Sequence, residues 1–500
     1  MLSKTRYVSG QQCHLRLWND QHQREVAEPV SASLQAIFDQ GHAVGELATR
    51  RFPGGVLVQE ESWPIEEACA RTAALMADPS VPAIFEAAFV HGGTLVRVDI
   101  LERGARGRWN LIEVKSTGSV KPVHLQDAAL QAWVVRGAGV RLGSVSVCTL
   151  NTAYVYDGSK LDLEQLFTVH DVSEQAEELR PAVAKNVPVL LRVLGQEHPP
   201  DIEPGPHCNE PYDCPYLAHC TRDLVPVSHP ITELPKLSAK KAALLSEHDI
   251  ESIHDLHLAP EELELTSLQE RVRDSVTRGV EFIAPELGAA LEEPTYPIFY
   301  LDFETFGPAI PRYAGTKPFE PVPFQWSIHV EDQSGTVRHE EFLSESDGDP
   351  REALAEALLL AVGSSGSICS YSFYENAVIR RLASALPKYR RRLTALLPRL
   401  WDLLPVVRQH YYHPDFRGSF SIKSVLPALV PGASYDELAV RDGMQAGLAY
   451  LAAITTEDAA RKAELLAALR AYCRRDSLGM VEVRRALLQK TSSGTLLDEV

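Results

Sequence analysis

Acidic and basic side chains lie on two neighbouring runs of the sequence that alternate like β-strands. Asp99 lies in VRVDIL, and Glu113 and Lys115 lie in IEVKS. Because strand side chains alternate between faces, Glu113 and Lys115 share one face, and a hairpin would bring Asp99 to them. Two carboxylates on apolar strands are costly to bury unless they bind a cation. The pattern predicts a Mg²⁺ or Mn²⁺ site in which Lys115 orients or deprotonates an attacking water; the alternative is a solvated Glu–Lys ion pair.

A second group of acidic residues is spread over the C-terminal part of the chain. Asp302 and Glu304 end an apolar strand as D-x-E, so both point to one side. Glu375 lies at a strand-to-helix junction, and Tyr472 and Asp476 are one helical turn apart in AYCRRD. Carboxylates converging from separate elements would hold two divalent ions about 4 Å apart for phosphodiester hydrolysis, with Tyr472 orienting the water. A single D-x-E at a strand end also occurs without any such function.

Three cysteines form an evenly spaced C-x5-C-x5-C in HCNEPYDCPYLAHC. The proline and polar residues between them do not suit an ordinary amphipathic helix. Three thiolates need a fourth ligand to close a metal or cluster site, and a histidine in that place would favour zinc. The cysteines concerned are Cys208, Cys214 and Cys220, with Cys13 as the leading fourth ligand and His207 and His219 as its competitors.

The remaining cysteines do not form a pattern. Eight cysteines in 500 residues are too few for a disulfide scaffold. Four of them stand singly among apolar or helical neighbours, and we interpret them as small buried hydrophobic residues. These are Cys69, Cys148, Cys369 and Cys473.

The elements that must position these residues form two α/β parts. Helical spacing over 31–52 and 65–77 precedes three strand-like runs, IFEAAFV, TLVRVDILE and RWNLIEVKS, which predict an antiparallel meander. A helix over 124–136, a strand in SVSVCTLN and a helix over 171–195 follow. The second part begins with the strand PIFYLDFET, continues through FQWSIHV, HEEFL and GSICSYS with helices between strands, and ends mainly helical. We therefore predict a multidomain α/β protein.

A connector separates these two parts. Its segment LPKLSAKKAALLSEHDIESIHDL predicts two short helices around a turn and is similar to helix-hairpin-helix elements, which hold the DNA backbone. Leu237-Ser238-Ala239 stands in place of the usual Gly-x-Gly turn. The candidate DNA contacts are Lys236, Lys240 and Lys241, and the alternative is a plain helical spacer. The predicted domains are 1–225, 226–294 and 295–500.

Composition restricts the classes of protein that remain. The chain has 49 Lys+Arg against 67 Asp+Glu and a formal net charge of −18, which argues against a large DNA-coating surface but not against a nucleic-acid enzyme. Apolar residues at 45% and charged residues at 23% exclude a mostly disordered chain. Apolar runs such as Ala357–Val362 are far shorter than the about 20 residues of a membrane span, and the start lacks the apolar region of a secretory signal. We expect a soluble cytoplasmic protein with no membrane partner.

The segments VRVDIL, IEVKS and DAALQAW together resemble the PD-(D/E)XK nuclease core in its RecB-like branch, over roughly residues 1–225. The resemblance implies metal binding by Asp99 and Glu113, Lys115 as catalytic lysine, and Gln131 as the glutamine of the helix motif. The tyrosine that usually follows that glutamine is absent, because Gln131 is followed by AWVV. His42 and Glu46 are candidates for the supporting residue on the preceding helix, or are plain exposed residues.

The placement of the cysteines, one before this core and three after it, resembles the iron–sulfur members of the same branch. By this resemblance a 4Fe–4S cluster is held by Cys13, Cys208, Cys214 and Cys220. Zn²⁺ is the alternative occupant of the four-cysteine site.

Residues 295–490 resemble the DnaQ-like DEDD exonucleases, which have an RNase H-like fold. DFET matches the first motif of that family, and Tyr472 with Asp476 matches the tyrosine form of its last motif. Glu375 stands where the middle motif normally supplies Asp. By the same resemblance Asp402 is supportive, and Lys423 in GSFSIKS lies near phosphate.

These resemblances imply a Mg²⁺- or Mn²⁺-dependent nuclease with two active sites, acting on nucleic acid with single-stranded ends. DNA is favoured over RNA as the substrate. The alternative is a nucleic-acid-binding scaffold in which one or both nuclease folds have lost their chemistry, because the middle motif is altered and the helix tyrosine is missing.

Overall fold

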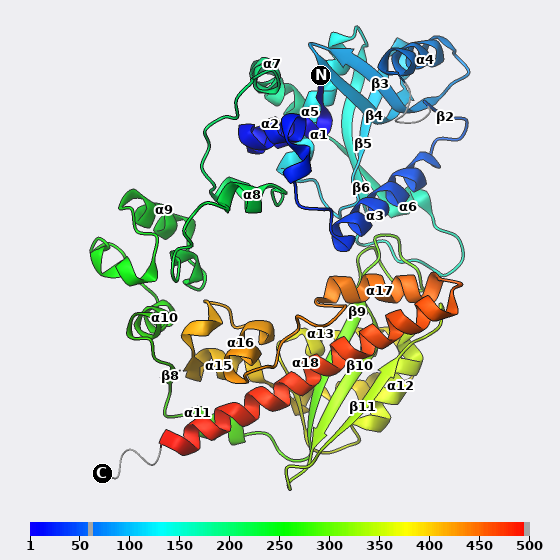
Figure 1. The fold of residues 1–500 in the computed structure, drawn as a ribbon. Helices are drawn as coiled ribbons and strands as arrows, with labels where there is room; N and C mark the ends of the chain where they lie inside the picture. Colours follow the sequence, from blue (N-terminus) through cyan, green and yellow to red (C-terminus); the bar gives the residue numbers. More distant parts are fainter. Residues whose placement is uncertain (59–63, 495–500) are drawn as a thin grey trace. The chain divides into compact units, whose positions relative to one another are not determined.

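The computed structural model describes residues 1–58 and 64–494, and Figure 1 shows their mixed α/β architecture. The chain divides into two compact units. The N-terminal unit comprises Met1–Leu224 and Pro308–Glu320, and the C-terminal unit comprises Val225–Gly307 and the chain from Pro321 onward. The connector seen in the sequence belongs to the C-terminal unit. The prediction of a multidomain α/β chain is confirmed.

The N-terminal unit is built on a mixed sheet with the strand order β2-β3-β4-β5-β6-β7, to which β1 adds by pairing with β4. The three predicted strands form the expected antiparallel meander, and β6 lies parallel to β5 after a crossover helix. The strands are β1 (Leu2–Ser3), β2 (Val56–Leu57), β3 (Ala83–His91), β4 (Thr94–Arg103), β5 (Trp109–Val114), β6 (Leu142–Leu150) and β7 (Phe167–Asp171).

Helices pack on this sheet through a continuous apolar core. The crossover helix α5 contributes buried Ala128, Leu130 and Val134, which meet the β4 residues Val96 and Val98. Along the first part of β4 buried residues alternate with partly exposed ones, and Asp99 is among the partly exposed ones. The helices of the unit are α1 (Lys4–Gln12), α2 (His14–His22), α3 (Ala32–Thr49), α4 (Ile65–Ala77), α5 (Pro122–Gly137), α6 (Leu163–Leu166), α7 (Ser173–Leu194) and α8 (Leu217–Thr221).

The C-terminal unit contains a five-stranded sheet with the order β11-β10-β9-β12-β13. Strands β9, β10 and β11 are antiparallel neighbours, whereas β12 is parallel to both β9 and β13. Its strands are β9 (Ile298–Phe306), β10 (Val322–Glu331), β11 (Val337–Leu343), β12 (Ser367–Ser370) and β13 (Leu400–Asp402), and a separate pair joins β8 (Phe282–Ile283) to β14 (Tyr411–Tyr412).

The two faces of the central strand β9 have different partners. Phe299, Leu301 and Phe303 pack with α12 and α13 in an apolar core. Side-chain alternation directs Asp302 and Glu304 to the opposite face, along which the long helix α18 runs in Figure 1. The helices are α9 (Ala239–Glu247), α10 (Ser267–Arg278), α11 (Leu287–Glu292), α12 (Arg351–Ala361), α13 (Tyr374–Ala385), α14 (Arg390–Thr394), α15 (Leu403–His410), α16 (Ile422–Leu429), α17 (Gly443–Thr455) and α18 (Ala459–Gly494).

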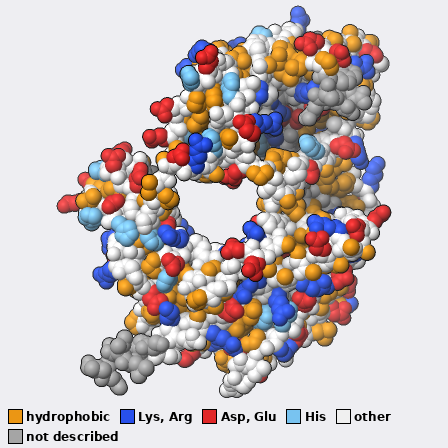
Figure 2. All heavy atoms as spheres, viewed as in Figure 1, with side chains coloured by type: hydrophobic (Ala, Val, Ile, Leu, Met, Phe, Trp, Pro, Cys, Tyr) orange, Lys and Arg blue, Asp and Glu red, His pale blue; other side chains and the backbone are white. Residues whose placement is uncertain are grey.

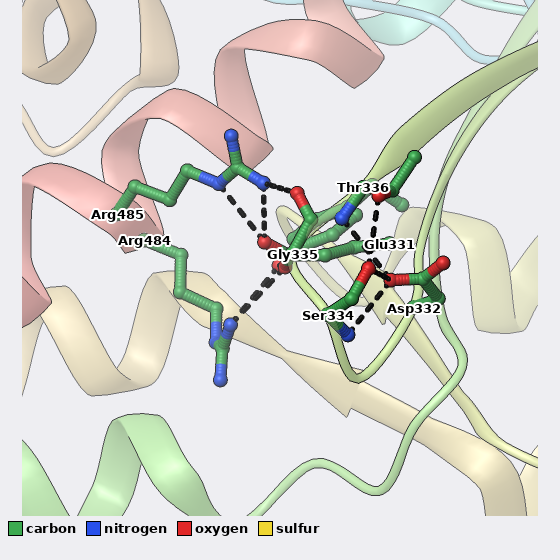
Figure 3. Close-up of polar contacts among 8 residues, drawn as sticks. Glu331, Asp332, Ser334, Gly335, Thr336, Arg484 and Arg485 are labelled. Atoms are coloured by element: carbon green, nitrogen blue, oxygen red, sulfur yellow. Dashed lines mark hydrogen bonds and ion pairs between the residues drawn. The ribbon is translucent and has the colours of Figure 1, made fainter.

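Two ion pairs, one of them buried, join helix α18 to the end of β10, as Figure 3 shows. Glu331 Oε2 lies 3.3 Å from Arg484 Nη1, and Glu331 Oε1 lies 2.7 Å from Arg485 Nη2. The hydroxyl of Tyr300 also donates to Glu331 Oε2, at 2.7 Å. These contacts join α18 to β10, the strand that pairs with β9.

The charged surface agrees with the composition. On the face drawn in Figure 2, acidic, basic and apolar side chains are interspersed over both units rather than gathered by sign. Among the described helices, none combines the length and the apolar character that a bilayer span requires.

Candidate functional site

The first candidate site, called the Glu113 site, lies at the end of β5, next to the middle of β4 and beside α5. Asp99 and Glu113 come together as predicted, because Asp99 Oδ2 accepts a hydrogen bond from Val114 N at 2.7 Å. The predicted Lys115 donates to Glu113 Oε1 at 2.7 Å. The predicted Gln131 donates from Nε2 to the other carboxylate oxygen of Glu113 at 2.6 Å. The structure therefore brings together the residues that the sequence suggested.

Two residues of this site were missed in the sequence. Lys4 Nζ lies 2.8 Å from Glu113 Oε1 and 3.8 Å from Asp99 Oδ1. Asp127, one turn before Gln131 on α5, accepts from Lys115 Nζ at 2.6 Å. Lys4 is placed by the short strand β1, whose Leu2 and Ser3 pair with β4, and by the Ser3 cap of α1. No spacing signal identifies Lys4, because it lies 109 residues before its partner Glu113.

The charges of the Glu113 site are largely balanced by its own lysines. Burial works against ionisation of Glu113, but the ammonium groups of Lys4 and Lys115 hold its pKa well below the ordinary value. Burial and the charge of Glu113 raise the pKa of Asp99 to about 8. The Lys4 ammonium lies beside both Glu113 and Asp99, the two carboxylates that would hold a divalent ion. Lys4 thus supplies positive charge where the sequence predicts a metal.

The donor set of the Glu113 site fits a hard cation. Two of its buried oxygen atoms, Asp127 Oδ1 and Gln131 Oε1, find no hydrogen-bond donor among the described residues. Buried polar atoms without a partner are rare and point to an absent ligand or water. By contrast, His42 and Glu46 are exposed on α3, where Glu46 pairs with Arg50 at 2.9 Å. This exposure agrees with the alternative drawn from the sequence, that both are ordinary exposed helix residues.

The second candidate site, called the Asp302 site, gathers carboxylates from β9, α13 and α18. Asp302 and Glu304 share the face of β9 that α18 covers. Glu375, in the first turn of α13, and Asp476, on α18, are close enough for their charges to act on Asp302. Of these four residues, Glu304, Glu375 and Asp476 are buried. The four predicted carboxylates therefore converge from three elements.

Electrostatic repulsion dominates the Asp302 site. Burial and the charges of Asp476, Glu304 and Glu375 raise the pKa of Asp302 well above its usual range. Burial and Asp476 do the same to Glu304, and burial raises the pKa of Glu375 to about 8. Four adjacent carboxylates cannot all be ionised in a buried site without a cation.

Two tyrosines and a cysteine contact the carboxylates of this site. This role was not predicted from the sequence for two of them, Tyr435 and Cys473. The predicted Tyr472 hydrogen-bonds to Asp476. Tyr435, which the sequence did not suggest, donates to Asp476 Oδ1 at 2.6 Å. Cys473 Sγ lies 3.4 Å from Asp302 Oδ2. Our interpretation of Cys473 as an ordinary buried hydrophobic residue is therefore incomplete: the thiol is buried, but it contacts a carboxylate.

Lys423 lies beside the Asp302 site, and its positive charge acts on both Glu304 and Asp476. Its Nζ lies 5.2 Å from the ring centre of Tyr472 and donates to the carbonyl of Arg441. Asp402, predicted to be supportive, caps α15 by accepting from Leu404 N at 3.0 Å. Its charge also raises the pKa of Glu375.

The four predicted cysteine ligands are near one another in the N-terminal unit. The charges of Cys13 and Cys208 act on both Cys214 and Cys220, and Cys214 N donates to the carbonyl of Cys208 at 2.8 Å. His207 Nε2 lies 3.7 Å from Cys208 Sγ.

Sulfur spacing bears on which group these cysteines could hold. Tetrahedral zinc with Zn–S bonds of about 2.3 Å requires sulfur atoms about 3.8 Å apart. Among the described residues, the groups of three ligand atoms within 4.8 Å of one another do not include these thiols. A 4Fe–4S cluster or a zinc ion at these cysteines stays a prediction.

The connector lysines show no shared site. Lys236 and Lys240 are exposed, whereas Lys241 Nζ lies 3.4 Å from Gln269 Oε1 of α10. Ser238 caps α9 by accepting from Lys241 N. DNA contact by these lysines stays a prediction.

Comparison with known proteins gives one family match. A family model described as "Domain of unknown function (DUF2779)" matches residues 299–421. The matched segment includes Asp302, Glu304 and Glu375 but ends before Tyr472 and Asp476. No curated protein and no solved structure matches the chain.

Proposed function

We propose that this protein is a metal-dependent nuclease that hydrolyses phosphodiester bonds at two active sites. The N-terminal unit would be a RecB-like PD-(D/E)XK nuclease carrying a 4Fe–4S cluster, and the C-terminal unit an RNase H-like DEDD exonuclease acting in the 3′–5′ direction. The observation that carries the proposal is the convergence of four acidic side chains at the Asp302 site, three of them buried.

The chemistry at the Asp302 site follows from its charges. Asp302, Glu304, Glu375 and Asp476 would hold the divalent ions, and bound Mg²⁺ or Mn²⁺ would supply Lewis acidity and an activated water. Tyr435 and Tyr472 orient Asp476 by hydrogen bonds to its carboxylate. Tyr472 is also placed to orient the attacking water. Lys423, beside Glu304 and Asp476, offers a positive charge to the substrate phosphate.

At the Glu113 site, metal would be held by Asp99 and Glu113. Gln131 holds the Glu113 carboxylate in a fixed orientation through its 2.6 Å hydrogen bond. Lys115 would stabilise the negative charge that develops on the phosphate. The nucleic-acid substrate, with DNA favoured over RNA, follows from the same reasoning: two sites of this type recognise the phosphodiester rather than a base.

The test is degradation of end-labelled single-stranded DNA, duplex DNA and RNA by the full chain with Mg²⁺ or Mn²⁺. Asp302→Asn and Lys115→Ala should each remove one activity, and the double variant should remove both. Glu457→Gln and Lys185→Ala, which alter exposed residues, are the matched controls. Unchanged degradation by the double variant would reject the proposal. Tight DNA binding without hydrolysis under any divalent metal would instead support the scaffold alternative.

A further inference from the structure

Cys473 occupies an unusual place for a buried thiol. It is fully buried on α18, and its sulfur lies against the carboxylate of Asp302 and 3.8 Å from the backbone carbonyl of the same residue. A thiol that served only as apolar filling would be surrounded by apolar atoms. Here the thiol contacts Asp302 and lies near Glu304 and Asp476, whose charges act on it.

The geometry of these atoms suits a metal bound through sulfur. One ligand atom each from Asp302, Glu304 and Cys473 lies within 4.8 Å of the other two. A tetrahedral Zn²⁺ with bonds of about 2.3 Å to sulfur and about 2.1 Å to oxygen separates those atoms by about 3.6 Å. The observed separation of Cys473 Sγ and Asp302 Oδ2 is 3.4 Å. A metal could therefore replace the thiol proton with little movement.

A second observation points independently to a cation at this place. Glu375 is 4% exposed, and its Oε2 has no hydrogen-bond partner among the described residues. The charge of Glu375 acts on Asp302 and on Glu304. A buried carboxylate oxygen that has no hydrogen-bond partner and stands near other carboxylates favours the binding of a cation.

We propose that Cys473, Asp302 and Glu304 form a binding site for a thiophilic divalent metal, of the class of Zn²⁺ and Cd²⁺. Mg²⁺ prefers oxygen ligands, whereas a thiolate selects softer ions. On binding, the Cys473 S–H bond breaks, the proton leaves to solvent, and a metal–sulfur bond forms. The ion would occupy the place of a hard metal and inhibit hydrolysis. The inhibition rests on the proposed nuclease function, but the binding does not.

Binding is tested by titrating Cd²⁺ into the full chain and recording the ultraviolet thiolate-to-Cd²⁺ charge-transfer band. Because the thiols of the proposed four-cysteine site would also bind Cd²⁺, the quantity measured is the difference between variants. Cys473→Ser should bind one equivalent of Cd²⁺ less than the unaltered chain, and the control Cys69→Ser, at a half-buried cysteine outside both sites, should bind the same amount.

Asp302→Asn provides a second test that leaves the thiol in place. This variant should also bind one equivalent of Cd²⁺ less, although Cys473 is intact. If circular dichroism shows that Cys473→Ser does not fold, the Asp302→Asn result tests the proposal. Equal Cd²⁺ stoichiometry in the unaltered chain and in the folded variants would overturn the proposal, whether or not the chain hydrolyses DNA.

Inhibition is the separate functional consequence. If the chain is a nuclease, Zn²⁺ should inhibit the Asp302 site of the unaltered chain at concentrations about tenfold lower than in Cys473→Ser, because the sulfur ligand is lost. Hydrolysis by Cys473→Ser with equal sensitivity to Zn²⁺ would contradict the assignment of sulfur as a ligand.

Discussion

The Glu113 site and the Asp302 site gather similar acidic side chains but treat their charge in opposite ways. At the Glu113 site, Lys4 and Lys115 both contact the same oxygen of Glu113, at 2.8 and 2.7 Å. At the Asp302 site, no described lysine or arginine nitrogen lies within ion-pair distance of the four carboxylates, and Lys423 acts on them only from beside the site. The N-terminal unit balances Glu113 with its own lysines, whereas the carboxylates of the Asp302 site mainly repel one another.

The two sites show two ways in which a buried carboxyl group can be tolerated in a folded protein: by ion pairs or by protonation. In the N-terminal unit, folding itself brings the lysines to Glu113, so the carboxylate stays ionised without metal. In the C-terminal unit, the raised pKa values of Asp302, Glu304 and Glu375 mean that protons take the place of metal. Stability, pH dependence and Mn²⁺ affinity should therefore respond differently to substitutions at the two sites.

The largest expected effect is on stability, and it has opposite signs at the two sites. Glu113→Gln leaves Lys4 and Lys115 without their shared partner and should destabilise the N-terminal unit by about 3–5 kcal/mol. Asp302→Asn replaces a carboxyl group whose ionisation its neighbours oppose with a neutral amide, and should leave the metal-free C-terminal unit as stable or more stable. Hydrogen exchange of β5 and β9 peptides in EDTA measures both. Destabilisation of similar size at the two sites would remove the distinction.

The second effect is the pH dependence of the metal-free C-terminal unit. The folded unit keeps a proton on Glu375 up to a pKa of about 8, whereas the unfolded chain releases it near its ordinary pKa of about 4.3. Stability contributed by this bound proton is therefore lost as pH rises, by about 2 kcal/mol between pH 6 and pH 8 for one carboxyl.

Unfolding in EDTA, followed by exchange of β9 peptides at the two pH values, checks this prediction. Saturating Mn²⁺ should reverse the trend, because metal binds the deprotonated carboxylates more tightly at higher pH. Asp302→Asn should weaken the pH dependence. A metal-free unit that gains stability from pH 6 to pH 8 would contradict the raised pKa values.

A smaller effect is expected from the lysine that stands beside the predicted metal position. Lys4→Met removes an ammonium group that lies 2.8 Å from Glu113, so Mn²⁺ no longer competes with it. Mn²⁺ affinity at the Glu113 site should rise about tenfold, or about 1.4 kcal/mol. Calorimetric titration in an Asp302→Asn background isolates this site, with Lys185→Met as the control. Weaker Mn²⁺ binding would show that Lys4 supports the metal rather than replacing it.

The smallest effect concerns the hydrogen bond to Asp476. Tyr435→Phe deletes the donor that lies 2.6 Å from Asp476 Oδ1 and should cost about 1 kcal/mol of stability in the C-terminal unit. Tyr156→Phe, which removes an exposed hydroxyl contact to the carbonyl of Ser159, is the control. Calorimetric Mn²⁺ titration should also show a changed affinity at the Asp302 site. Identical exchange and Mn²⁺ binding in the two variants would mean that Tyr435 does not orient Asp476.

The sequence by itself determined the elements and the residues that regular periodicity places together. Alternation along β9 puts Asp302 and Glu304 on one face, and the four-residue spacing of Tyr472 and Asp476 puts both on one side of α18. The meander β3–β4–β5 and the helix α5 that follows it come from the same periodic patterns, whereas Gln131 was singled out through the family resemblance.

Only the tertiary structure decided which distant groups complete each site. Lys4 reaches Glu113 because β1 pairs with β4, and Cys473 and Asp476 meet their partners because α18 packs on β9. The physical reason is that periodicity constrains neighbours within one element, whereas contacts between elements depend on packing across many residues. The charge balance of the two sites arises at that second level.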